Sequence, residues 1–141
     1  MLRQRVFTAL ALAALFLGSV LFLSLPTLAL GLAAVIGLGG WEWGRLAGWQ
    51  SLAARTGFVV ALALCMLGLY IYCDLGSRPA RGQVQPVLGL ACLWWSFALL
   101  WVKSYPASAV FWRSRLARSL MGLLVLACAW LAAVYLLSFP R

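Results

Sequence analysis

The sequence predicts an all-α membrane protein: a polytopic helix bundle of about five transmembrane helices plus a short interfacial helix. Two observations predict this fold class. The 141 residues are 66% hydrophobic and only 9% charged, with a mean hydropathy of +1.04, whereas about a quarter of the residues in soluble domains are charged. Four uncharged stretches of 18 to 22 residues also recur along the chain, close to the roughly 20 residues that cross a bilayer.

The first predicted span covers 6–25 and follows the basic residues Arg3 and Arg5. A basic start before an apolar run is also typical of signal peptides. Their apolar core is usually about 7 to 15 residues long, and this run has 20. We therefore expect an uncleaved membrane anchor.

The second predicted span covers 28–46 and is the least regular. Its apolar run, 28–41, has 14 residues, which cover only about 21 Å in a helix. The span must therefore include the segment up to Leu46, where Arg45 can extend toward the head groups. The remaining predicted spans are 56–73, 84–102 and 120–139.

The connection between the last two spans is long enough for a helix of its own, which we place at 107–118. If helical periodicity holds from 109 to 120, one face is apolar, whereas Arg115 and Arg118 lie together on another face. The apolar positions are Ala109, Trp112, Leu116 and Leu120. This pattern predicts an interfacial helix with a basic side.

Basic residues predict the orientation of the spans. Eleven Lys and Arg oppose two acids, for a net charge of +9. With a cytoplasmic N-terminus, eight of the basic residues fall on the inner side and only Arg78, Arg81 and Arg141 on the outer side, as the positive-inside rule requires. Membrane lipids, above all anionic phospholipids, are the expected partners. Nucleic acid is not expected, because no soluble domain could carry it.

Glu42 is the only glutamate in the chain and lies between Trp41 and Trp43. Arg45 follows three residues later on the same side of a helix, so we predict a boundary ion pair between Glu42 and Arg45. Two alternatives stay open. Glu42 could contact a substrate or lipid head group, or it could couple proton movement in a transporter, where an acid is expected near the bilayer midplane.

Four basic residues, Lys103, Arg113, Arg115 and Arg118, are the candidate contacts for anionic head groups. The alternative for this group is simple positive-inside anchoring beside an aromatic belt. Small residues four apart predict close helix packing in lipid. The candidate packing residues are Gly37, Gly40, Gly44 and Gly48. Packing within one bundle is the main interpretation of this spacing, and a homodimer is the alternative.

Catalytic groups are scarce in the sequence. The chain has no histidine, and its only acids are Asp74, in a predicted outer loop, and Glu42, at the inner end of the second span. Acids on opposite sides of a bilayer cannot share a metal ion. We therefore predict that this chain contains no catalytic residue, no metal site and no bound cofactor.

Several short motifs together resemble the N-terminal half of the bacterial phosphatidate cytidylyltransferases, the CDP-diacylglycerol synthase family. They are the opening 1–6, the segment 40–48, Trp94-Trp95, Tyr105-Pro106, Trp112, Arg113, Arg118, 121–123 and Trp130. The resemblance implies a multi-pass enzyme of the bacterial inner membrane. Such an enzyme joins CTP and phosphatidate into CDP-diacylglycerol and releases pyrophosphate, using magnesium.

The catalytic signature of that family lies in its C-terminal half and includes a His-Gly-Gly and paired aspartates, which this chain lacks. The resemblance therefore implies a truncated member, the membrane scaffold portion of such an enzyme, inactive by itself. CTP and magnesium are expected only for the complete enzyme. The alternatives are a non-catalytic small multi-pass membrane protein that acts by helix association and, less favoured, a transporter.

Overall fold

The structure is a computed structural model that describes residues 2–76 and 81–139. Within these ranges the chain is helical and contains no strand. The elements in order are α1 (Leu2–Phe22), α2 (Leu25–Leu46), α3 (Leu52–Tyr72), α4 (Arg81–Lys103), the 3₁₀ helix η1 (Ala107–Trp112) and α5 (Arg115–Leu137). All five α-helices are long and apolar enough to cross a membrane. The predicted all-α, multi-pass fold class is confirmed. Of the predicted outer basic residues, Arg78 and Arg141 lie outside the described residues.

Several helices begin before the spans predicted from the uncharged runs. α3 begins at Leu52 rather than at residue 56, and α5 at Arg115 rather than at 120. The reason is that backbone hydrogen bonding continues through charged residues, so a helix extends beyond its apolar stretch. Each of these two helices has a serine N-cap: the Ser51 hydroxyl accepts from the Ala54 N–H at 3.2 Å, and the Ser114 hydroxyl accepts from the Ala117 N–H at 3.0 Å.

The single interfacial helix predicted at 107–118 is wrong. η1 ends at Trp112, and Ser114 has an extended backbone, with φ −76° and ψ 146°. Because a serine N-cap has non-helical dihedral angles, Ser114 ends one helical segment and begins the next. Arg115 and Arg118 consequently belong to the first turn of α5.

η1 folds back onto the end of α4 through aromatic contacts. The Trp101 ring stacks on Phe111 with centroids 5.8 Å apart and meets Trp112 edge-on at 6.2 Å. The Ser108 hydroxyl donates a 2.6 Å hydrogen bond to the Trp101 carbonyl. This segment therefore has a defined shape between α4 and α5.

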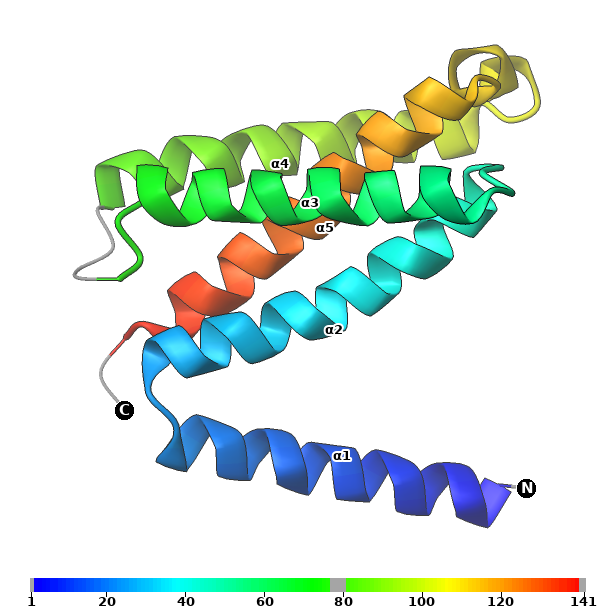
Figure 1. Cartoon of the computed structure of the whole chain (residues 1–141). Helices are drawn as coiled ribbons and strands as arrows, with labels where there is room; N and C mark the ends of the chain where they lie inside the picture. Colours follow the sequence, from blue (N-terminus) through cyan, green and yellow to red (C-terminus); the bar gives the residue numbers. More distant parts are fainter. Residues whose placement is uncertain (1, 77–80, 140–141) are drawn as a thin grey trace.

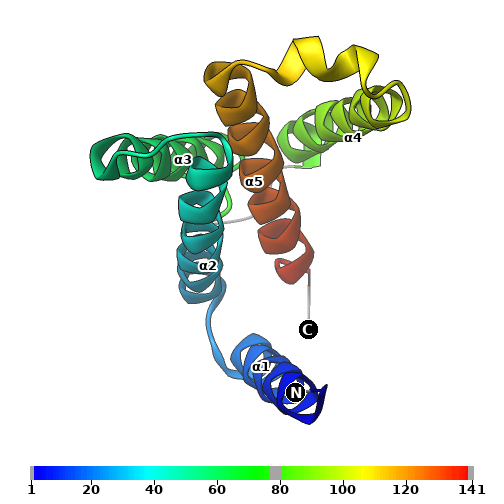
Figure 2. The same ribbon diagram turned by 90° about the vertical axis from the view of Figure 1, so that its right-hand side faces the viewer.

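α5 is the central helix, in contact with α2, α3 and α4 (Figures 1 and 2). Its buried residues Leu131 and Val134 pack with Leu62 of α3 and Val84 of α4 in one apolar core. Trp130 is also buried, and its indole N–H donates to the Ala29 carbonyl of α2 at 2.9 Å. α1 lies apart from this core, and no residue in its apolar segment is buried (Figure 1).

Candidate basic and tryptophan-rich site

Three tryptophans and three arginines gather where the α2–α3 connection meets the beginning of α5. We call this group the Trp–Arg cluster. Its members are Trp41, Trp43, Trp49, Arg55, Arg115 and Arg118. The cluster brings together residues that are more than 70 positions apart in the sequence.

Two indole N–H groups attach the α2–α3 connection to the first turns of α5. Trp43 donates to the Arg118 carbonyl at 2.9 Å, and Trp49 donates to the Ser119 hydroxyl at 2.8 Å. Ser119 in turn donates to the Arg115 carbonyl at 2.9 Å. These bonds are directional, and a tryptophan that is partly buried usually finds such a partner. They fix the position of the basic start of α5 relative to α2.

Trp43 also lies directly against Gly122 of α5. A methyl group added at Gly122 would overlap the indole ring. Only glycine leaves room for this contact, so Gly122 is a packing residue. It was not among the predicted packing residues, because no second small residue lies four positions before or after it in the sequence.

Arg118 uses its guanidinium mainly on the backbone. One terminal nitrogen donates to the Arg113 carbonyl at 2.9 Å, and the other lies 3.5 Å from the Leu46 carbonyl. Its Nε is covered and has no hydrogen-bond partner in the described part of the chain. Among the four predicted head-group residues, Arg118 is therefore the one whose side chain contributes most to the contact between α2 and α5.

Arg55 belongs to the site, although the sequence analysis did not include it among the candidates. Its guanidinium carbon lies 4.1 Å from the centre of the Trp41 ring, within cation–π distance, and a terminal nitrogen donates to the Trp41 carbonyl at 3.3 Å. The side chain is partly buried. The sequence does contain one indication of this role: Arg55 lies in the first turn of a helix that follows a tryptophan-rich segment.

The other predicted head-group residues are exposed. Arg115 lies 5.9 Å from the centre of the Trp49 ring, and Arg113 follows η1. Lys103 ends α4, and η1 separates it from the start of α5 (Figure 2). The structure thus groups the three arginines around the start of α5 and leaves Lys103 apart from them.

Glu42 and Arg45 form an ion pair with 3.1 Å between Oε2 and Nη2. Both side chains are exposed, by 57% and 63% respectively. Exposed ion pairs contribute little stability, about 0 to 1 kcal/mol. The pair therefore neutralises the only glutamate of the chain without holding the fold together.

The four predicted packing glycines differ in their surroundings. A methyl group at Gly40 would come within 2.7 Å of Leu62, and one at Gly44 would touch the aliphatic part of Arg55 at 3.6 Å. Gly37 has no neighbour within 4 Å. Gly48 lies beyond the end of α2 and has a φ of +99°, so it is a turn residue that needs the left-handed region and not part of the helix. A methyl group there would touch the Arg115 side chain of α5 at 3.5 Å.

Comparison with curated proteins reveals two relatives that carry the same name. Phosphatidate cytidylyltransferase of Pseudomonas aeruginosa is 39% identical over 140 residues, which are 99% of this chain and 49% of that protein. The protein of that name from Haemophilus influenzae is 39% identical over 120 residues, 79% of this chain and 40% of the relative. The chain is homologous to phosphatidate cytidylyltransferases.

The chain spans about half the length of the cytidylyltransferases it matches. No protein-family model and no solved structure matches it. The similarity covers nearly the whole chain, so it includes the Trp–Arg cluster as well as the apolar spans.

Magnesium, which the resemblance to cytidylyltransferases implies, does not fit the donors of this chain. The described residues contain no group of three or more His, Cys, Asp or Glu side chains. Asp74 follows α3, whereas Glu42 lies near the end of α2, close to the beginning of α3. Two carboxylates at opposite ends of one helix cannot hold the same ion.

Proposed function

We propose that this chain is the membrane scaffold portion of a phosphatidate cytidylyltransferase. The complete enzyme would join CTP and phosphatidate into CDP-diacylglycerol and release pyrophosphate. One observation carries the proposal: 39% identity extends over 99% of the chain to a relative about twice as long. The comparisons do not favour a non-catalytic small membrane protein or a transporter.

We propose that the chemistry of the complete enzyme lies outside these residues. Transfer of the cytidylyl group from CTP needs metal ions to neutralise the leaving pyrophosphate, and the described residues contain no group of three or more His, Cys, Asp or Glu side chains to hold them. CTP and magnesium would therefore bind elsewhere in the complete enzyme. The role proposed for this chain is to hold the bundle in place and to contact lipid.

A chimera tests the scaffold role directly. The chain replaces the matching segment of the Pseudomonas aeruginosa relative, and CTP-dependent formation of CDP-diacylglycerol is measured in membranes. We expect the chimera to be active and the 141-residue chain alone to form no product. An inserted and folded chimera without activity would contradict the proposal, as would product formed by the chain alone.

The exposed arginines at the start of α5 are proposed to contact the anionic head group of phosphatidate, with Lys103 and Arg118 as further basic groups on the same side. Arg113 and Arg115 are the better test, because Arg118 also holds α2 and α5 together. In the active chimera, Arg113→Gln with Arg115→Gln should raise the apparent KM for phosphatidate about thirtyfold, because each lost charge costs about 1 kcal/mol. The matched control is Arg3→Gln with Arg5→Gln on α1, and equal KM values for both pairs would refute the contact.

We also propose that the chain lies in the bacterial inner membrane with its N-terminus in the cytoplasm. The support is the eight-to-three distribution of basic residues across the connections. A homodimer stays a prediction from the small-residue spacing.

A further inference from the structure

A continuous apolar groove runs between α2 and α3. It consists of two adjoining cavities of about 410 and 390 Å³, which share Ala33, Ala63 and Met66. The first reaches Pro26 and the second reaches Trp41. These 15 residue steps along α2 correspond to about 22 Å, most of the roughly 30 Å hydrocarbon core of a bilayer. The groove is therefore long enough to run across most of the apolar layer.

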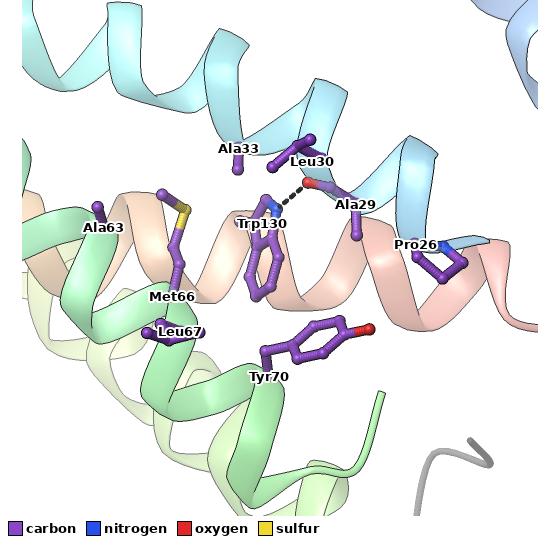
Figure 3. A pocket seen from close by; sticks show the side chains of 9 residues that line it. All are labelled: Pro26, Ala29, Leu30, Ala33, Ala63, Met66, Leu67, Tyr70 and Trp130. Atoms are coloured by element: carbon purple, nitrogen blue, oxygen red, sulfur yellow. Dashed lines mark hydrogen bonds between the residues drawn. The ribbon is translucent and has the colours of Figure 1, made fainter. Parts of the chain in front are cut away.

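Small side chains create this groove. Ala33 and Gly37 of α2 face Ala63 of α3 along it, and Gly37 has no neighbour within 4 Å. Trp130 of α5 projects between the two helices, fixed by its bond to the Ala29 carbonyl (Figure 3). The close contact of α2 with α3 occurs instead at Gly40, against Leu62. The small-residue spacing thus lines the groove along α2, and it gives a tight contact with α3 at Gly40.

The Trp41 end of the groove carries a positive charge. Arg55 lies over the Trp41 ring, and Val59, one turn further along α3, lines the groove. Neither acid of the chain neutralises Arg55, because Glu42 pairs with Arg45 and Asp74 follows the other end of α3. An apolar groove that ends at a cationic side chain is complementary to a molecule with an acyl chain and a phosphate.

We propose that this groove binds one anionic phospholipid of the bilayer, with an acyl chain between α2 and α3 and the phosphate at Arg55. The bilayer supplies acyl chains to any apolar surface that faces it, and they are as apolar as the leucines around them. Arg55 adds the preference for a negative head group. The inference goes beyond the proposed function, because a lipid held in this way is a structural ligand and need not be the substrate.

Photolabelling tests the proposal in the 141-residue chain. The chain is placed in phosphatidylcholine nanodiscs with a trace of phosphatidylglycerol that carries a photoreactive acyl chain, and labelled peptides are mapped by mass spectrometry. We expect labelling around Ala63 and Met66, with competition by unlabelled phosphatidylglycerol and much weaker competition by phosphatidylcholine. Labelling spread evenly over all helices, α1 included, or equal competition by both lipids would overturn the proposal.

Two matched pairs of variants sharpen the result. Ala63→Trp fills the groove and should abolish its labelling, whereas Ala14→Trp adds the same bulk to exposed α1 and should leave it unchanged. Arg55→Gln should lower the preference for phosphatidylglycerol about fivefold, and Arg5→Gln should not.

Circular dichroism checks that each variant is folded. If Arg55→Gln does not fold, the competition experiment on the unmodified chain still decides the head-group preference. An Ala63→Cys variant tests for a helix as the occupant. A disulfide between two copies at this position, without lipid labelling, would assign the groove to a second copy of the chain and overturn the proposal.

Discussion

Gly122 leaves room for the Trp43 indole at the point where α2 meets the beginning of α5. The same indole donates to the Arg118 carbonyl one turn earlier. A single glycine thus allows both the ring contact and the hydrogen bond, and any larger side chain displaces both. This makes Gly122 the residue on which the geometry of the Trp–Arg cluster depends most.

Gly122→Ala should lower the free energy of unfolding by about 1 to 3 kcal/mol, because the methyl group overlaps the ring and neither helix can move away freely. Thermal unfolding in detergent measures the effect. The matched control is Gly31→Ala on α2, where nothing lies within 4 Å. That change should be neutral or slightly stabilising, and equal losses in both variants would show that the Trp43 contact is not the cause.

Residue-level features were only partly predictable from the sequence. The Glu42–Arg45 pair is local, three residues apart in one helix, and the structure contains it. The contact of Trp43 with α5 joins residues 75 positions apart. No short-range pattern encodes such a contact, because it depends on how α2 and α5 cross.

At the level of elements, the number of spans was predictable because each apolar run must be long enough to cross the bilayer. The helix ends were less predictable, because charge marks the edge of the hydrocarbon layer and not the end of backbone hydrogen bonding. The error at 107–118 has the same origin. An apolar periodicity continued through Ser114, but the serine side chain bonds to the Ala117 N–H and starts a new helix there.

Ser114→Ala should therefore loosen the start of α5, at a cost of about 1 kcal/mol for the lost N-cap. Hydrogen exchange of the amides around Ala117 should become faster. Ser96→Ala is the control, because Ser96 lies within α4 and its hydroxyl donates to the Cys92 carbonyl of the same helix. If exchange near Ala117 were unchanged by the Ser114 substitution, the cap would not be the element that begins α5.

For the whole molecule, the main division is between α1 and the packed group α2–α5. Core residues such as Leu131 and Val134 are fully buried, whereas no residue in the apolar segment of α1 is buried. Figure 1 shows α1 apart from the other helices. Hydropathy cannot distinguish these two situations. The mean hydropathy of α1, 2.0, lies within the range of 1.4 to 2.4 of the four packed helices, and only the arrangement of the bundle separates the two kinds.

Unfolding experiments should reveal this division. Leu131→Ala should cost about 2 to 5 kcal/mol, because it opens a cavity in the core that α5 shares with α2, α3 and α4. Leu12→Ala on α1 is the same chemical change at a side chain that is 59% exposed, and it should have almost no effect. A comparable loss in both variants would mean that α1 packs against the rest of the chain.

Because α1 lies apart from the other helices, we expect bilayer thickness to change its tilt more than theirs. α1 has 21 residues and is joined to α2 by only Leu23 and Ser24. A helix about 31 Å long responds to a thinner bilayer by tilting, and none of the residues in the apolar segment of α1 is buried in the described structure to oppose this tilt. The four other helices could tilt only as a packed group. The angle between α1 and α2 therefore follows the local thickness of the bilayer, while the Trp–Arg cluster keeps its geometry.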